Sequence, residues 1–220
     1  PEFTSLEYYQ AYSDVYSMMD FTENLIRYVA KETGNVCFQY AGNRIDLNNP
    51  FKKQSMFDLL EEYTNTDVSG MDVPALRKLV DVKLLELPEE INYGQILDKL
   101  FGEFVEPNLI EPTFVIDYPK AISPLAKENR DGKKDIVERF ELFISGMEFA
   151  NSFSELNDPI EQRKRFEFQA QLREAGDEEA QVLDENFLQA MEVGMPPTGG
   201  VGIGVDRLIM LLTQQQSIKD

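Results

Sequence analysis

The chain has 220 residues, enough for one domain with a substantial core, and its formal net charge is −19. Such a surface repels nucleic-acid phosphates, and no block of Lys and Arg offsets it, so most of any RNA-binding surface would lie elsewhere. The absence of histidine excludes a Ser-His-Asp triad and a His-ligated zinc site. Any metal would therefore be a hard cation held by carboxylates.

The sequence also bears on the cellular compartment. No apolar run is long enough to cross a membrane, and residues 1–5 lack the apolar segment of a signal peptide. The single cysteine, Cys37, excludes an internal disulfide framework and fits a reducing compartment, so we expect a cytoplasmic location without membrane contact. We interpret Cys37 as a small buried residue rather than a nucleophile, because no histidine is present to activate it.

The first quarter of the chain alternates between strand and helix patterns. Residues 4–12 alternate with period two and predict a strand, and residues 14–31 predict an amphipathic helix. Residues 35–40 and 44–47 predict two strands joined by the turn at 41–43.

Residues from about 55 to 108 are helical and charged, with helices expected over 56–63, 73–82 and 93–104. They resemble a helical insertion in a β-rich domain. After it we expect a strand over 112–118, a hairpin of 136–143 with 147–155, helices over 159–175 and 184–193, and a glycine-rich strand with a final helix. Antiparallel strands flanked by helices indicate an α+β fold.

The glycine-rich strand is the most distinctive segment. Gly200, Gly202 and Gly204 leave one face of the strand without side chains, so that a flat ligand can lie against backbone. Arg207 follows at once, and its guanidinium suits phosphate oxygens or stacking on a base. A packing run of glycines with a surface arginine is the alternative interpretation.

The hairpin carries two acidic residues. A two-residue turn at Ser145-Gly146 predicts Phe143 opposite Glu148 and Glu141 opposite Ala150, with Glu141 and Glu148 on one face. Two carboxylates one diagonal apart suit Mg²⁺ bound to a polyphosphate. Two ordinary glutamates on a solvated sheet face are the alternative.

A second polar set follows in the same strand. Asn151, Phe153 and Glu155 share a face, but by parity it is the face opposite Glu148. If all of them serve one pocket, a bulge must intervene, and we place it near Ala150.

The first strand has an aromatic and acidic face of its own. Phe3, Glu7 and Tyr9 lie on one side, where they could stack a base and hold a cation. A half-buried strand of mixed character is the alternative.

These segments occur in a familiar order. Residues 1–12 resemble the second half of motif 2 of class II aminoacyl-tRNA synthetases, and the run Gly-Val-Gly-Ile-Gly-Val-Asp-Arg207 resembles motif 3. Residues 138–146 and 148–158 are similar to the lysyl-tRNA synthetases in particular. Further segments that fit are Glu111-Pro-Thr-Phe114, Tyr118-Pro119, Ser123-Pro-Leu-Ala126 and the helical insertion. The resemblance covers nearly the whole chain.

The resemblance implies a fold, a reaction and a set of site residues. Residues 1–220 would be the C-terminal half of a class II synthetase catalytic domain, an antiparallel sheet flanked by helices. The reaction would join lysine to ATP, giving lysyl-adenylate, and then transfer lysine to tRNA(Lys). For ATP, Phe3 would stack on adenine, Arg207 would contact the γ-phosphate and adenine, and Glu141 and Glu148 would hold Mg²⁺.

For lysine, Glu155 and Tyr9 would hold the ammonium. The rest of the lysine pocket would be lined by Glu7, Asn151 and Phe153, with Gly202 as its floor.

The resemblance also implies parts that this sequence does not contain. They are motif 1, the arginine of motif 2 that clamps the α-phosphate, and an anticodon-binding OB domain. We therefore expect a piece of a longer, homodimeric protein, and we expect these 220 residues alone not to activate lysine.

Two other functions stay open at this point. One is a paralogue that ligates lysine-like groups to a translation elongation factor, against which the longer helical insertion argues. The other is a non-catalytic interaction module derived from a synthetase. An aspartate-specific enzyme fits less well, because its pocket needs a cation where Glu155 stands.

Overall fold

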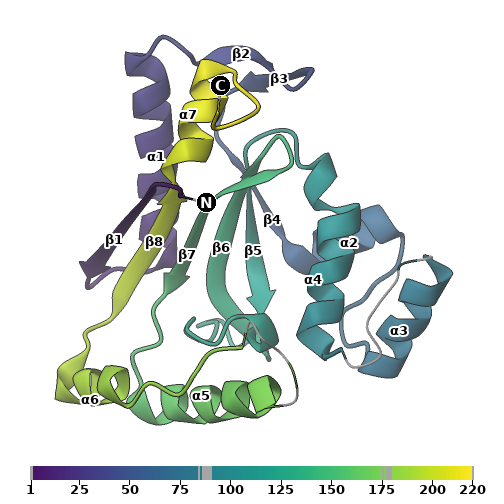
Figure 1. The fold of residues 1–220 in the computed structure, drawn as a ribbon, viewed down its shortest axis with the longest axis vertical. Helices are drawn as coiled ribbons and strands as arrows, with labels where there is room; N and C mark the ends of the chain where they lie inside the picture. The colour runs from purple at the N-terminus through teal and green to yellow at the C-terminus, as the bar shows by residue number, and fades with distance from the viewer. Residues whose placement is uncertain (1, 84, 86–90, 175, 177–179, 220) are drawn as a thin grey trace.

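The computed structural model describes residues 2–83, 85, 91–174, 176 and 180–219. A six-stranded sheet forms the centre, and all neighbouring strands are antiparallel except β4 and β5. In spatial order the strands are β1 (Ser5–Ala11), β8 (Thr198–Gly204), β7 (Met147–Ser154), β6 (Ile136–Ile144), β5 (Thr113–Pro119) and β4 (Lys52–Ser55). Helices flank this sheet, which confirms the predicted α+β class (Figure 1).

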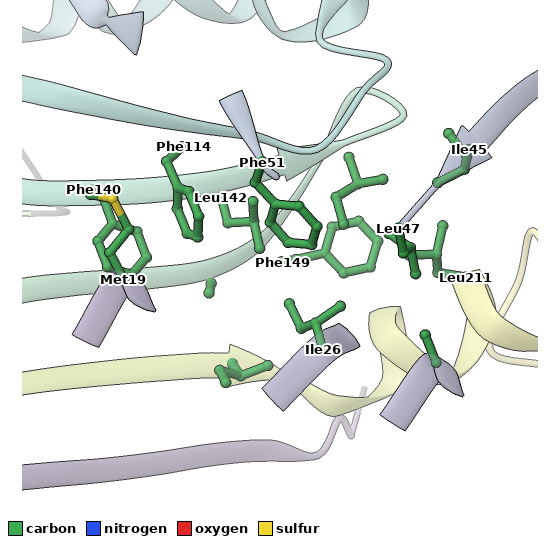
Figure 2. Packing of buried hydrophobic residues seen from close by; sticks show 14 of the residues in the cluster. Met19, Ile26, Ile45, Leu47, Phe51, Phe114, Phe140, Leu142, Phe149 and Leu211 are labelled. Atoms are coloured by element: carbon green, nitrogen blue, oxygen red, sulfur yellow. The ribbon is translucent and has the colours of Figure 1, made fainter. Parts of the chain in front are cut away.

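One face of the sheet is covered by α1 (Val15–Glu32), α7 (Val205–Thr213) and the separate hairpin of β2 (Cys37–Tyr40) and β3 (Asn43–Asp46). Helix α1 begins at Asp14, whose carboxylate accepts a hydrogen bond from the Ser17 amide at 3.0 Å and caps the helix. Figure 2 shows the main core, in which Met19 and Ile26 of α1 meet Phe140 and Phe149 of the sheet.

The predicted insertion lies beyond the β4 edge, opposite β1 (Figure 1). It comprises α2 (Met56–Thr64), α3 (Val73–Val82) and α4 (Tyr93–Phe104), which share a second core with β5 and β6. A short 3-10 helix, η1 (Glu106–Asn108), precedes β5, and a second one, η2 (Lys120–Ile122), follows it. A third, small core joins α5 (Pro159–Glu174) to α6 (Glu185–Gly194).

The β6–β7 hairpin confirms part of the predicted register and corrects the rest. Phe143 pairs with Glu148 as predicted, but Ala150 pairs with Leu142 and Asn151 pairs with Glu141. The register therefore shifts by one residue at Phe149. A bulge next to Ala150 was the condition under which both polar sets would share a face, and the structure contains it.

Two other expectations were wrong or incomplete. Cys37 is exposed rather than buried, because β2 alternates and turns Phe38 and Tyr40 inward. The Arg44 Nε group donates to the Cys37 thiol at 3.3 Å. Strand β4 was not predicted, because its sequence Lys-Lys-Gln-Ser55 has no apolar alternation. Its extended conformation is set by hydrogen bonding to β5.

No helix in the described ranges is both long enough and apolar enough to span a membrane.

A buried ion pair fastens α1 to the sheet. Glu138 is 3% exposed, and its carboxylate accepts hydrogen bonds from Arg130 Nε at 2.5 Å and from the Ser154 hydroxyl. Ser154 in turn accepts from the Val15 amide at 3.0 Å, and Arg130 also pairs with Asp14 at 2.9 Å. Burial raises the pKa of Glu138, but the hydrogen bonds from Arg130 and Ser154 outweigh it, so the pKa is lowered overall.

Glu138→Gln should destabilise the chain by about 2 kcal/mol, because it removes the buried charge that pairs with Arg130. The loss is smaller than for a fully buried pair, because Arg130 is half exposed. Since the folded pKa is lowered, this contribution is present above the unfolded pKa of about 4.3 and disappears as the pH falls through the folded value. Urea unfolding at pH 7 and pH 3 measures both effects.

The matched control for this prediction is Glu185→Gln. Glu185 pairs with Arg163 through two contacts of 2.7 Å, but both side chains are exposed. We expect a change within about 0.5 kcal/mol there. Equal losses in the two variants would contradict the role of burial at Glu138.

Candidate active site

The side of the sheet opposite α1 carries three alternate glycines of β8, Gly200, Gly202 and Gly204, which we call the glycine face. Apolar residues between them, Val201 and Ile203, point into the main core. Gly200 pairs with Tyr9 on one side and with Phe153 on the other, and Gly202 pairs in the same way with Glu7 and Asn151. The glycine face is therefore a bare strip between two rows of side chains.

At one end of the strip, Glu155 and Tyr9 cover Gly200. A Cβ atom built on Gly200 would lie 2.1 Å from Glu155 Oε1 and 2.6 Å from Tyr9 Cδ1. Both distances are too short for a Cβ contact, so with any other residue at position 200 Glu155 and Tyr9 would have to shift. Gly202, the predicted floor, has only Glu7 Cγ near it, at 3.8 Å.

Glu155 is an acidic group in an unusual setting. Its carboxylate has no hydrogen bond or ion pair with any residue that the structure describes, although its side chain is partly buried. Burial raises the pKa of Glu155 to about 7. Burial and the charges of Glu155 and Glu7 likewise raise the pKa of the Tyr9 phenol. This end of the strip is therefore negative, and no cation among the described residues pairs with Glu155.

The bulge at Phe149 determines which β7 residues face the strip. Phe149 and Ala150 both point into the main core, so every later residue changes face. As a result Asn151, Phe153 and Glu155 lie on the same face as Glu148 and Glu141. The structure thus brings together two sets that simple alternation would separate.

The other end of the strip has a mixed charge. Arg207 Nη1 donates to the Glu148 carbonyl at 2.5 Å and lies 3.7 Å from the Glu148 carboxylate. Burial and the neighbouring Glu141 raise the pKa of Glu148 to about 7. Glu141 accepts a hydrogen bond from the Tyr118 hydroxyl at 2.7 Å and another from Arg139.

Phe3 lies at this same end. It precedes β1 and is 76% exposed, while the neighbouring Thr4 amide donates to Asp206 at 2.5 Å and the Thr4 carbonyl accepts from Val205. Because Asp206 adjoins Arg207, these bonds bring Phe3 to the Arg207 end. Glu155 and Arg207 are separated along the strip by about four residues of strand, or about 13 Å.

The site offers few ligands for a divalent cation. In the described ranges, no three His, Cys, Asp or Glu side chains are grouped to hold a metal. Glu141 and Glu148 would supply the oxygen ligands, and Mg²⁺ commonly takes one or two carboxylates and completes its shell with substrate phosphates and water. The residues therefore fit a magnesium ion that arrives with a polyphosphate.

Sequence reasoning named Gly200 as a bare position of the strand, but only the structure shows which side chains it accommodates. It missed two residues of this site altogether. Arg139 and Tyr118 form a buried cluster with Glu141. No sequence spacing indicates that cluster, because β5 and β6 are brought together by strand pairing across residues 120–135.

Known proteins resemble this chain over its whole length. The family model of tRNA synthetases class II (D, K and N) matches residues 1–220. The chain belongs to this family. Relatives called lysine–tRNA ligase cover all of it: the protein of Moorella thermoacetica is 50% identical, that of Thermoanaerobacter sp. 51% and that of Porphyromonas gingivalis 47%. The chain spans 45%, 44% and 38% of these three proteins, less than half of each.

Gly200→Ala should destabilise the chain by about 1–3 kcal/mol, because the new methyl group overlaps Glu155 and Tyr9 and forces both to move. The control is Gly102→Ala in α4, where a Cβ meets nothing within 4 Å and helix propensity predicts a gain of up to about 1 kcal/mol. Thermal unfolding of the two variants measures the difference. Unfolding of Gly200→Ala at or above the wild-type temperature would contradict this account of the site.

Proposed function

We propose that the chain is the C-terminal half of the catalytic domain of a lysine–tRNA ligase. The observation that carries the proposal is Glu155, a partly buried carboxylate with a raised pKa and no internal cation, next to Tyr9 over a bare glycine. A buried charge without a partner is costly, so such a site favours a ligand that brings a cation. The family and the names of the relatives support lysine as that ligand.

Lysine would lie along the glycine face with its ε-ammonium between Glu155 and the Tyr9 phenol. Glu7, Asn151 and Phe153 would line the remainder, over Gly202. Leucine or methionine would leave Glu155 without a partner in a desolvated pocket, and their binding would be correspondingly weaker.

ATP would occupy the Arg207 end. Phe3 would stack on the adenine, and Arg207 offers a fork of donors to the γ-phosphate and a flat face to the base. Glu141 and Glu148 would hold Mg²⁺, which supplies charge neutralisation for the triphosphate.

The reaction has two steps. The lysine carboxylate attacks the α-phosphorus of ATP, pyrophosphate leaves, and lysyl-adenylate forms. The terminal ribose hydroxyl of tRNA(Lys) then attacks the lysyl carbonyl and AMP leaves. The first step needs alignment and charge compensation more than a proton acceptor, so the lack of histidine in this chain is compatible with it.

The remaining expectations belong to the same proposal. Protein biosynthesis in the cytoplasm, a homodimer, and tRNA binding mainly by surfaces outside this acidic chain are what the function implies. The experiments below use the complete enzyme of which this chain is proposed to be part.

Glu155→Gln in the complete enzyme should raise the KM for lysine by about 100-fold or more, because the ammonium loses its charged partner in a desolvated pocket. The KM for ATP should change little, since Glu155 lies at the opposite end of the strip. Lysine-dependent ATP–pyrophosphate exchange measures both constants.

Glu103→Gln, at an exposed pair with Lys99 in α4, is the matched control and should leave both constants unchanged. An unaltered lysine KM in Glu155→Gln would overturn the proposed function.

Lysine affinity should also depend on pH. Only ionised Glu155 compensates the ammonium, and its pKa is about 7 without ligand. The dissociation constant should therefore rise by up to about tenfold for each pH unit below 7, and level off above pH 8, where lysine keeps its proton up to about pH 10.

Calorimetric titration with lysine in the absence of ATP isolates this effect from Glu148, which titrates near the same pH at the other end. Glu155→Gln should bind weakly and without the pH dependence. A flat profile in the wild-type protein would contradict the assignment of Glu155.

A further inference from the structure

Arg139 is a buried cation at the middle of the site. It lies on β6, pairs in register with Phe153, and shares its face with Glu141 two residues later. Its side chain is 12% exposed. A buried guanidinium needs a hydrogen-bond acceptor for its N–H donors. The acceptors around Arg139 are therefore held in place together with it.

Hydrogen bonds from three segments surround this guanidinium. Nε donates to Asn151 Oδ1 at 3.2 Å on β7, and Nη2 donates to Glu141 Oε1 on β6. Nη1 donates to the Ile122 carbonyl at 2.8 Å and to the Ser123 hydroxyl at 2.9 Å, at the end of η2.

Two aromatic rings pack against the Arg139 guanidinium. The Arg139 guanidinium carbon lies 4.6 Å from the Tyr118 ring centre and 5.5 Å from that of Phe153. The Tyr118 hydroxyl also donates to Glu141 Oε2, so both oxygens of Glu141 are held by this one cluster.

The cluster sets the orientation of two groups proposed to contact ligands. Arginine has donors only, so the Asn151 atom beside Nε is the oxygen, and the amide nitrogen faces away from Arg139. The Glu141 carboxylate is fixed through both oxygens, and its charge is compensated before any ligand arrives. Lysine at position 139 could not make these contacts together, because an ammonium lacks the planar fork.

We propose that Arg139 is a positioning residue that orients Asn151 for lysine and Glu141 for the triphosphate through one guanidinium. The inference deepens the proposed function and rests on it. It differs from a purely structural role, because it requires that substrate binding change when the guanidinium is replaced and folding is preserved.

The first test is Arg139→Lys, with lysine affinity measured by calorimetry on the complete enzyme without ATP or metal. We expect the lysine dissociation constant to rise by about tenfold or more, because a donor to Asn151 is lost. Pyrophosphate exchange should in addition require several-fold more Mg²⁺ for half-maximal rate.

The control is Arg165→Lys on α5. Arg165 is 7% exposed and donates to the Ala126 carbonyl at 2.7 Å and to Glu161 at 3.1 Å, and within the described chain it has no hydrogen bond or ion pair with a residue proposed to bind a ligand. It should lose thermal stability comparably and keep its lysine affinity within twofold. Equal changes of affinity in both variants would assign Arg139 a structural role only.

Two further variants keep the inference falsifiable if Arg139→Lys does not fold. Tyr118→Phe removes only the hydroxyl that holds Glu141 Oε2, and should raise the Mg²⁺ requirement without changing the lysine dissociation constant. Asn151→Ala combined with Arg139→Lys should weaken lysine binding less than the product of the single effects, because both act on one contact.

The outcomes separate the two levels of inference. Wild-type enzyme without lysine-dependent exchange would overturn the proposed function and this inference with it. Active wild-type enzyme with unchanged lysine affinity in folded Arg139→Lys, or with an unchanged Mg²⁺ requirement in Tyr118→Phe, would overturn the role of Arg139 alone.

Discussion

The extra residue in β7 is the constraint on which the site depends. Without the shift at Phe149, strand alternation would turn Asn151, Phe153 and Glu155 toward the main core. A carboxylate would then replace an apolar side chain there, at a cost that the fold could not offset. The core favours the bulge as well, because it receives Phe149 and Ala150 in succession. Packing on one face and function on the other therefore require the same irregularity.

The absence of side chains matters as much as their presence. On β8, Val201 and Ile203 anchor the strand in the core, and the glycines between them leave the opposite face open. Gly200 permits the approach of Glu155 and Tyr9, whereas Gly202 lies under open space beside Glu7. A strand with alternate glycines forfeits packing on one side, and the sheet compensates through the pairing of β8 with both β1 and β7.

Much of this arrangement could be predicted from the sequence, because periodicity and turn residues are local signals. The hairpin turn at Ser145-Gly146 was predicted from two residues, and both have the positive φ that such a turn needs. The register shift at Phe149 has no local sequence signal. It was predicted only as the condition under which the two polar sets of the hairpin would share one face. The strand at Lys52 depends on a partner far along the chain, which a single sequence does not specify, whereas the exposure of Cys37 follows from which face of β2 packs on the core.

The carboxylates of the chain differ in what compensates them, and this difference separates structural from ligand-binding groups. Glu138 is held by Arg130 and Ser154, its pKa is lowered, and it fastens α1 to the sheet. Glu141 has Arg139 and Tyr118 as partners and, on the proposed function, would be held in place for Mg²⁺. Glu155 has no partner among the described residues, and its pKa is raised.

All three carboxylates belong to β6 or directly follow β7, so position in the sheet alone does not assign their roles. Their burial and partners do. Glu138, already paired with Arg130 in the interior, would gain little from a cationic ligand, whereas Glu155 would recover on binding the electrostatic free energy that burial took from it. On the proposed function, the free energy of lysine recognition would come from Glu155, a carboxylate that the fold leaves without an internal partner among the described residues.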